Sequence, residues 1–302
     1  ETGRHYDAFC VFDADNLVHL DFLAVMNTRL MKGQKVLQGY LSAKNPVDTW
    51  VSGTFAIAFW TVNHLWHLGK YNLGLSSCLG GTGMCISADI VREFGWGCDC
   101  LTEDMEFSMK CLSHGIRTCW VHDAIIYDEK PLTFMASWRQ RKRWAQGQFD
   151  CSERYIPILM KEGFKRHSIV VLDGIMQLLQ NYFLLISAFY LVMTYINMFY
   201  PCFTVVLYND ALVPRQFWSV LGTIQYVLPL IVLLQIEVPA KIYLYWLIYP
   251  VFMYSWVPVT FLGWIHRHEK QWVHTIHTRS MQFQAASLTR KKGNRQLVCI
   301  YL

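Results

Sequence analysis

The sequence predicts an α/β domain with a mainly parallel sheet, followed by an α-helical transmembrane domain. Strand-like and helix-like segments alternate over residues 1–165, which is typical of strands joined by crossover helices. Charge is then rare over residues 168–265, which hold two basic and three acidic side chains. Because the rest of the chain has ordinary charge, we expect a soluble domain joined to a membrane domain.

The composition of the whole chain reflects this membrane region. Of the 302 residues, 53% are apolar and 16% are charged, whereas a soluble domain has about 45–50% apolar and about 25% charged residues. This balance excludes a disordered chain, a collagen-like repeat and an ordinary cytosolic enzyme. The net charge of +5 is small and spread along the chain, so we expect no nucleic-acid partner.

The first elements are expected from apolar runs and helical spacing. Residues 8–12 form an apolar run that stops at Asp13, as a buried parallel strand would. Apolar spacing predicts a helix over residues 22–31, and residues 35–40 are strand-like. An Asn-Pro turn then precedes a long aromatic-rich helix over residues 47–68.

The second half of the domain begins with a Gly/Ser-rich loop over residues 74–83. A strand over residues 84–87 and a helix over residues 88–94 are expected next. A helix over residues 103–114 is ended by a glycine. The remaining expected elements are a strand over residues 116–121 and a basic helix over residues 133–154.

Three uncharged runs follow, and each is long enough to cross the hydrocarbon of a bilayer, which takes roughly 20 residues. They comprise residues 174–209, 216–236 and 242–265. The first run is too long for one span and too short for two, so we expect residues 174–181 to be interfacial. Trp and Tyr near the ends of the runs fit the two interfaces of a bilayer.

The topology of these runs stays open at the level of sequence. Three crossings would place the first domain and the C-terminus on opposite sides, whereas the basic residues favour both inside. One segment is therefore a candidate for a re-entrant or interfacial helix, and Pro250 and Pro258 make residues 242–265 the kinked candidate. The end of the chain is either a solvated tail or a flank that touches anionic lipid. Its basic residues are Arg290, Lys291, Lys292 and Arg295.

The cysteines and histidines carry no clear metal signature. Ten cysteines are present, but Cys98 and Cys100 are two positions apart, unlike the Cys-x-x-Cys of zinc and redox sites. We expect a reducing cytosol with no structural disulfide and no zinc. A histidine group past the last apolar run lies among Lys and Arg, which disfavours a metal site. It comprises His266, His268, His274 and His277.

Asp13-Ala14-Asp15 follows a predicted strand directly. Side chains at the carboxyl edge of an α/β sheet face the ligand crevice. Two carboxylates at this spacing can hold a hard divalent ion, with a diphosphate at its other positions. Alone, the pattern is more often a helix cap or an Asx turn.

Thr102-Glu103-Asp104 stands at the start of a predicted helix. The structural interpretation is a Thr N-cap with acids that complement the helix dipole. The functional interpretation is a carboxylate that acts as general base on an attacking hydroxyl.

Gln140-Arg141-Lys142-Arg143-Trp144 lies within the predicted basic helix. One interpretation is a solvated basic face near a membrane. The other is that the Arg groups offset the charge on a diphosphate leaving group while the Trp ring stacks on a sugar.

In this order, the three motifs resemble those of the membrane-embedded processive family-2 glycosyltransferases, the group of cellulose, hyaluronan and poly-N-acetylglucosamine synthases. Asp15 and Asp104 are 89 positions apart, Asp104 and Gln140 are 36 apart, and an apolar region follows. The resemblance covers residues 1–265 and implies part of an A-type nucleotide-sugar glycosyltransferase domain.

The resemblance implies roles for the first acidic motif and for the glycine-rich loop. Asp13 and Asp15 would bind Mg²⁺ or Mn²⁺ and the nucleotide diphosphate. Gly81 and Thr82 would lie beneath the donor and acceptor sugars.

It also implies roles for the second and third motifs. Asp104 would be the general base, with Glu103 beside it. The third motif would engage the diphosphate through its amide and guanidinium groups and line the acceptor site with its indole. Its members are Gln140, Arg141, Arg143 and Trp144.

One departure from the family concerns the start of the chain. The family carries an upstream nucleotide-binding half with a further Asp for the uracil base, whereas 12 residues precede Asp13. We therefore expect a fragment of a larger synthase or a truncated remnant. Residues 1–165 are expected to form an incomplete cytosolic catalytic domain, residues 166–265 interfacial and transmembrane helices, and residues 266–302 a basic cytosolic tail.

The resemblance implies inverting transfer of a sugar from a UDP-sugar to a growing β-linked glycan at the plasma membrane, coupled to polymer export. The implied partners are the UDP-sugar, the glycan acceptor and the lipid bilayer. The alternative is a catalytically incomplete fragment or a non-enzymatic assembly subunit of a polysaccharide synthase. A channel or transporter is disfavoured because the apolar runs lack central charges apart from Asp173.

Overall fold

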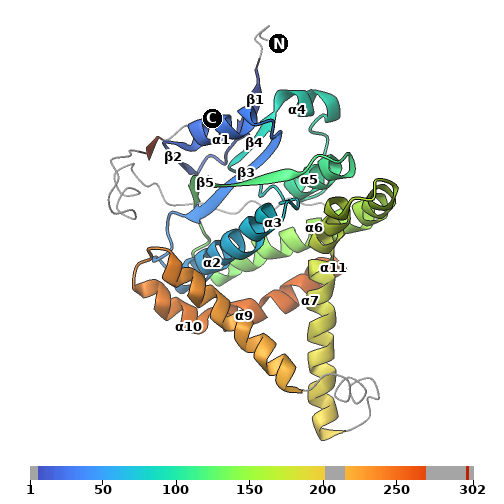
Figure 1. The fold of residues 1–302 in the computed structure, drawn as a ribbon. Coiled ribbons are helices and arrows are strands. Elements are labelled where there is room, and N and C mark those ends of the chain that lie inside the picture. Colours follow the sequence, from blue (N-terminus) through green and yellow to red (C-terminus); the bar gives the residue numbers. More distant parts are fainter. Residues whose placement is uncertain (1–5, 201–214, 270–296, 299–302) are drawn as a thin grey trace.

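A computed structural model describes residues 6–200, 215–269 and 297–298 (Figure 1). The described strands form one sheet in the order β1-β4-β3-β5-β2-β6. Their bounds are β1 (Ala8–Val11), β2 (Leu17–His19), β3 (Val36–Ala43), β4 (Met84–Ser87), β5 (Thr118–Asp128) and β6 (Leu297–Val298).

The sheet is mixed, so the prediction of a mainly parallel sheet is wrong. β3 and β5 run parallel, whereas the other neighbouring strands are antiparallel. The physical reason lies in the glycine-rich loop over residues 80–83, which places Met84 opposite Val11 at the end of β1. β4 therefore runs back between β1 and β3, and the loop and the first acidic motif share one edge of the sheet.

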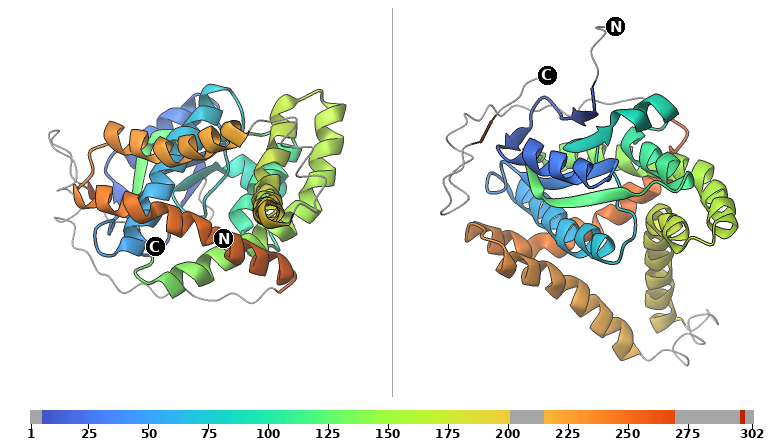
Figure 2. Two further views of the ribbon diagram at one scale, coloured as in Figure 1. Left: turned by 90° about the horizontal axis from the view of Figure 1, so that it is seen from below. Right: turned by 45° about the horizontal axis from the view of Figure 1, so that its top comes forward.

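Helices cover both faces of this sheet (Figures 1 and 2). α1 (Phe22–Met31) has the bounds expected from its apolar spacing and packs on β5. The predicted helix over residues 47–68 is α2 (Trp50–Thr61), which continues through a π-helical turn, η1 (Val62–His67), into α3 (Leu68–Asn72). α2 packs on β3 from the opposite side.

The remaining helices connect the sheet to the apolar region. α5 packs against α6, α6 against α7 and α11, and α10 against α2. α7 then extends away from the α/β lobe (Figure 1). The bounds are α4 (Ala88–Phe94), α5 (Glu103–Ser113), α6 (Phe134–Lys165), α7 (Ile169–Phe199), α9 (Arg215–Gln235), α10 (Lys241–Tyr254) and α11 (Trp256–Ile265).

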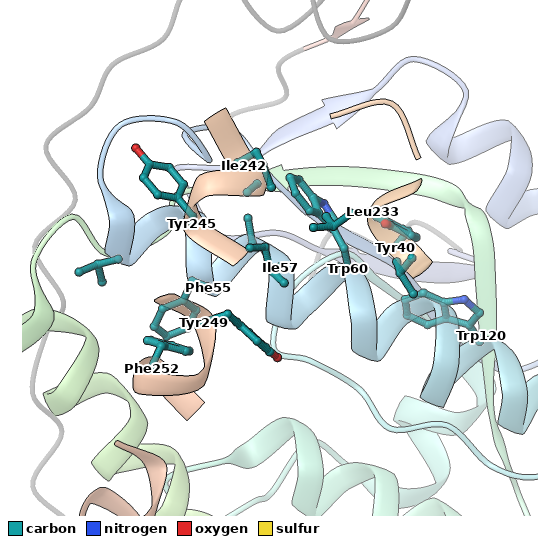
Figure 3. Packing of buried hydrophobic residues seen from close by; sticks show 14 residues of the cluster. Tyr40, Phe55, Ile57, Trp60, Trp120, Leu233, Ile242, Tyr245, Tyr249 and Phe252 are labelled. Atoms are coloured by element: carbon teal, nitrogen blue, oxygen red, sulfur yellow. The ribbon is translucent and has the colours of Figure 1, made fainter. Parts of the chain in front are cut away.

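An aromatic cluster joins the sheet and α2 to α9 and α10 (Figure 3). Phe55 of α2 lies edge-on to Phe252 of α10, with 5.2 Å between the ring centroids. Gly53 permits this close approach, because an added Cβ would lie 2.1 Å from Cδ2 of Tyr245. α10 is therefore packed into the α/β lobe as a part of its core.

Two described helical segments are long and apolar enough to cross a membrane, namely Ile169–Asn197 and Lys241–Ile265. A shorter apolar helix covers Gly222–Gln235. The second long segment is broken at Ser255, in line with the kink expected from its prolines, and its halves lie along α2 and α6.

Two further predictions concern residues 174–181 and the C-terminal tail. Residues 174–181 continue α7, and Leu178 in this part is fully buried in a cluster with side chains of α5 and α6. The tail expected over residues 266–302 lies mostly outside the described residues.

Candidate active site

A glycine-rich loop at the edge of the sheet is held by one buried side chain. The Oε1 atom of Gln38 accepts a hydrogen bond from the Gly80 N–H (2.8 Å), and its Nε2 donates to the Thr82 carbonyl (3.0 Å). Gly81 adopts φ +79°, in the left-handed region where a side chain is strained. Gln38 thus fixes the loop from β3, directly beneath it.

The same loop holds the first acidic motif. Oγ1 of Thr82 accepts a hydrogen bond from the Asp13 N–H (3.0 Å) and another from Nδ2 of Asn16. Thr82 is buried, whereas the Asp13 side chain is exposed. The backbone at Asp13 is therefore fixed, and its side chain lies at the surface of this edge.

A network of charged residues fixes Asp15 at the carboxyl ends of β3 and β5. Nζ of Lys44 donates to the Asp15 carbonyl (2.8 Å) and lies 3.1 Å from Oε2 of Glu129. The Glu129 N–H in turn donates to Oδ2 of Asp15 (3.3 Å). Nζ of Lys130 donates to Oδ2 of Asp128 (2.8 Å), and burial lowers the pKa of Lys130.

Asp104 lies beside Gly81 of the glycine-rich loop. A Cβ added to Gly81 would be 3.4 Å from Oδ2 of Asp104, so the glycine leaves room beside this oxygen. Oδ1 accepts a hydrogen bond from the Met105 N–H (2.8 Å). Burial, and next the negative charge of Glu103, raise the pKa of Asp104 to about 7, while Arg143 opposes the rise.

Three side chains of the third motif share one face of α6, because they are three and four positions apart. Arg143 interacts electrostatically with Asp104. Oε1 of Gln140 is buried and has no hydrogen-bond partner among the described residues. Trp144 packs against Phe59, with 6.3 Å between the ring centroids, and Nζ of Lys130 lies 3.2 Å from the Phe59 centroid. An aromatic contact thus joins the Trp of α6 to the charged edge of the sheet.

Arg141 lies elsewhere, contrary to its expected place beside the diphosphate. Its side chain is fully buried against the junction of α10 and α11. Nη1 donates to Oγ of Ser255 (2.8 Å), and the guanidinium carbon lies 4.5 Å from the Phe252 centroid. Residues two apart on a helix point about 200° apart, so Arg141 and Arg143 face different neighbours.

The acidic motif is the candidate metal site. Within the described parts of the chain, no group of three or more His, Cys, Asp or Glu side chains is arranged to hold a metal ion. Asp13 and Asp15 offer two carboxylates, and Mg²⁺ commonly binds through one or two carboxylates with water and substrate phosphate. This donor set fits a metal that arrives with a diphosphate.

Sequence reasoning missed several residues that hold the site together. Lys44 and Glu129 directly follow β3 and β5, which is the signal that selected Asp13 after β1. The rule did not find them because the predicted strands end at residues 40 and 121, whereas β3 and β5 continue to Ala43 and Asp128. Gln38 and Glu106 had no such signal. Oε2 of Glu106 accepts hydrogen bonds from the main-chain N–H groups of two residues that precede the second motif (2.7 and 2.8 Å).

Comparison with known proteins identifies the family of this chain. One relative is "Probable glycosyltransferase YdaM" of Bacillus subtilis (strain 168), which is 26% identical over 144 residues. That match covers 47% of this chain, and the chain spans about a third (34%) of the relative's length. Residues 8–264 match the family described as "Glycosyl transferase family group 2", which is well over half of the chain. The chain therefore belongs to glycosyl transferase family group 2.

Proposed function

We propose that this protein transfers a sugar from a UDP-sugar to the end of a growing β-linked glycan, with inversion at the anomeric carbon. One observation carries the proposal: a single loop is bonded to Asp13 through Thr82 and passes Asp104 at Gly81, where an added Cβ would lie 3.4 Å from Oδ2 of Asp104. A diphosphate-binding motif and a carboxylate base are thereby one loop apart. A donor sugar that lies between a diphosphate and an acceptor hydroxyl requires such an arrangement.

Asp104 is the proposed general base. It takes the proton of the acceptor hydroxyl as the hydroxyl oxygen bonds to the anomeric carbon and the bond to the diphosphate oxygen breaks. UDP leaves with the electron pair of that bond. A pKa near 7 suits this role, because a base is most effective when its pKa is close to the working pH.

Arg143 is proposed to stabilise the leaving diphosphate. A fixed cation beside the leaving group stabilises the negative charge that develops in the transition state. The two tasks can share one site because the half-buried Asp104 lies beside the loop and interacts electrostatically with Arg143 of α6. Trp144 is proposed to line the acceptor site.

Asp13 and Asp15 are the proposed ligands of Mg²⁺ or Mn²⁺. The metal, when bound, neutralises charge on the diphosphate. The protein's own part is orientation: Thr82 holds the Asp13 backbone, and the Glu129 N–H holds one oxygen of Asp15. The carboxylates of Asp13 and Asp15 are the proposed donors.

A bilayer is the proposed surroundings of α7 and α9. Both helices expose more large apolar side chains than isolated surface positions would explain. Examples are Phe183, Ile186, Phe189, Ile224, Val227 and Ile231. We propose a plasma-membrane protein with its catalytic domain in the cytosol and export of the product. Proteoliposomes should then accumulate polymer that is protected from added glycosidase, and product found exclusively outside would contradict export.

The test of the proposed chemistry uses the full-length protein in membranes and a panel of radiolabelled UDP-sugars. Asp104→Asn should lower transfer by about 10²–10⁴-fold, the usual contribution of a general base. Asp99→Asn is the matched control, because the Asp99 side chain lies near the same segment and is 81% exposed. It should keep the parent rate.

A thermal unfolding midpoint separates lost chemistry from lost structure. Asp104→Asn should unfold at a higher temperature than the parent at pH 8, because the parent must bury a charged carboxylate there. Transfer near the parent rate in Asp104→Asn would reject Asp104 as the base. No transfer from any UDP-sugar by the parent would reject the proposed function.

A further inference from the structure

We propose that Arg141 is a positioning residue, which fixes α6 against the junction of α10 and α11 and so sets where Arg143 meets Asp104. The inference rests on the proposed function for its kinetic readout. It concerns a residue that points away from the reacting groups and acts through the helix that carries them.

Arg141 occupies an aromatic box. Its guanidinium carbon lies 4.5 Å from the ring centroid of Phe252, 5.1 Å from that of Trp256 and 5.8 Å from that of Phe134. Nη1 donates to Oγ of Ser255, the residue at which α10 ends and α11 begins. The side chain therefore touches both halves of the broken apolar segment at the break itself.

This cation is held without an acidic partner among the described residues. Arg141 is fully buried, and its Nη2 makes no hydrogen bond within the described part of the chain. Desolvation lowers its pKa to about 10. A planar cation is stabilised by stacking on aromatic faces. The aromatic box therefore favours arginine over an apolar residue and fixes the direction of its side chain.

The next contacts along α6 are closely packed. A Cβ added to Gly263 of α11 would lie 2.5 Å from Cβ of Ala145. A Cβ added to Gly147 would lie 2.6 Å from Oγ1 of Thr102, in the motif that ends at Asp104. One stretch of α6 is thus packed against α11 and against the second acidic motif.

Because these contacts are closely packed, a movement of α6 at one of them shifts the others. Protein interiors are as dense as organic crystals and respond to strain by shifting neighbours. Arg141 and Arg143 point about 200° apart on one helix, so a rotation or slide of α6 at the aromatic box moves Arg143 relative to Asp104. Misplacement of a catalytic group by about 1 Å costs up to about 10²-fold in rate.

The experiment compares three variants of the full-length protein in membranes. Arg141→Met removes the cation and keeps an unbranched side chain, and Arg141→Lys keeps the charge but loses the planar group. Arg139→Met is the matched control, because Arg139 is exposed on the same helix. Arg141→Met should lower kcat by about 10–100-fold with a donor KM within about twofold, Arg141→Lys should recover part of kcat, and Arg139→Met should match the parent.

Amide hydrogen exchange supplies a readout that does not depend on activity. In Arg141→Met, exchange should rise at the α10–α11 junction and also at residues 102–105, whereas Arg139→Met should change neither. A kcat equal to that of Arg139→Met would overturn the proposal. So would a fall in kcat without faster exchange at residues 102–105.

Two further outcomes are also decisive. If Arg141→Met does not fold, Ser255→Ala removes the hydroxyl that accepts the hydrogen bond from Nη1 of Arg141. A smaller loss of kcat with the same exchange pattern then supports the proposal, and unchanged kcat and exchange overturn it. A parent without transferase activity, but with exchange that responds at residues 102–105 in Arg141→Met, would reject the proposed function and leave the positioning role standing.

Discussion

Buried cations are held differently at the edge of the sheet and in the aromatic layer, which is the cluster that joins the sheet and α2 to α9 and α10. At the edge, Nζ of Lys44 lies 3.1 Å from Glu129 and Nζ of Lys130 lies 2.8 Å from Asp128. In the aromatic layer, Arg141 is surrounded by rings and has no ion pair among the described residues. At the edge, each cation is paired with a carboxylate beside the candidate active site, whereas the aromatic layer surrounds its cation with rings.

The largest expected effect is on stability at the edge. Lys44→Met should lower the free energy of unfolding by about 3–5 kcal/mol, because it leaves Glu129 buried without its partner. Denaturant unfolding measures this difference. Lys35→Met is the control, because Lys35 pairs with Asp89 on the surface (2.6 Å), where such pairs contribute little. Equal losses in the two variants would remove the distinction between the edge and an ordinary surface.

The aromatic layer should show its own dependence on pH. His67 stacks on Trp120 with 4.7 Å between ring centroids, and burial lowers its pKa to about 4. An unfolded histidine has a pKa of about 6.5, so the unfolded state takes up a proton before the folded state does as the pH falls. The free energy of unfolding is therefore highest above pH 6.5 and is lower by about 2 kcal/mol at pH 5.

Variants isolate this histidine. His67→Gln should flatten the fall in stability between pH 7 and pH 5, whereas His114→Gln, which changes an exposed histidine, should keep it. Thermal unfolding over this pH range tests the prediction. An unchanged slope in His67→Gln would show that another group causes the pH dependence.

The glycine-rich loop gives the smallest change in stability and the clearest contrast in activity. Gly81 and Gly33 have φ of +79° and +81°, so Ala at either position should cost about 1–2 kcal/mol. An added Cβ at Gly81 meets Oδ2 of Asp104 at 3.4 Å, whereas at Gly33 nothing lies within 4 Å. Gly81→Ala should therefore also lower kcat by about tenfold, and equal kcat in both variants would separate the loop from the chemistry.

Local pattern predicted much of this molecule because many elements depend on nearby residues. The apolar spacing over residues 22–31 gave the bounds of α1 as the structure has them. The position of Asp13 and Asp15 directly after a strand predicted that they lie at an edge of the sheet. In the structure the glycine-rich loop lies at the same edge, where Oγ1 of Thr82 accepts a hydrogen bond from the Asp13 N–H. Both signals depend on residues that are close together in the sequence.

Long-range geometry escaped prediction for a physical reason. The direction of β4 depends on how residues 80–83 turn. The apolar run over residues 8–12 predicted a buried parallel strand, but such a run reports burial and does not fix the direction of the neighbouring strand, and β1 pairs antiparallel with β4. Likewise, helical spacing indicates that Arg141 and Arg143 face apart, but not which one faces Asp104. That choice is made by the aromatic rings of α10 and α11, more than 100 residues along the chain.

The most direct test of the account is the pH profile of kcat/KM for transfer. A base must be unprotonated, so the rate should rise with pH through the pKa of Asp104, at about 7. The negative charge of Glu103 raises this pKa and the positive charge of Arg143 lowers it. Glu103→Gln should therefore move the acid limb to lower pH and Arg143→Gln to higher pH. An acid limb that stays in place in both variants would contradict Asp104 as the base.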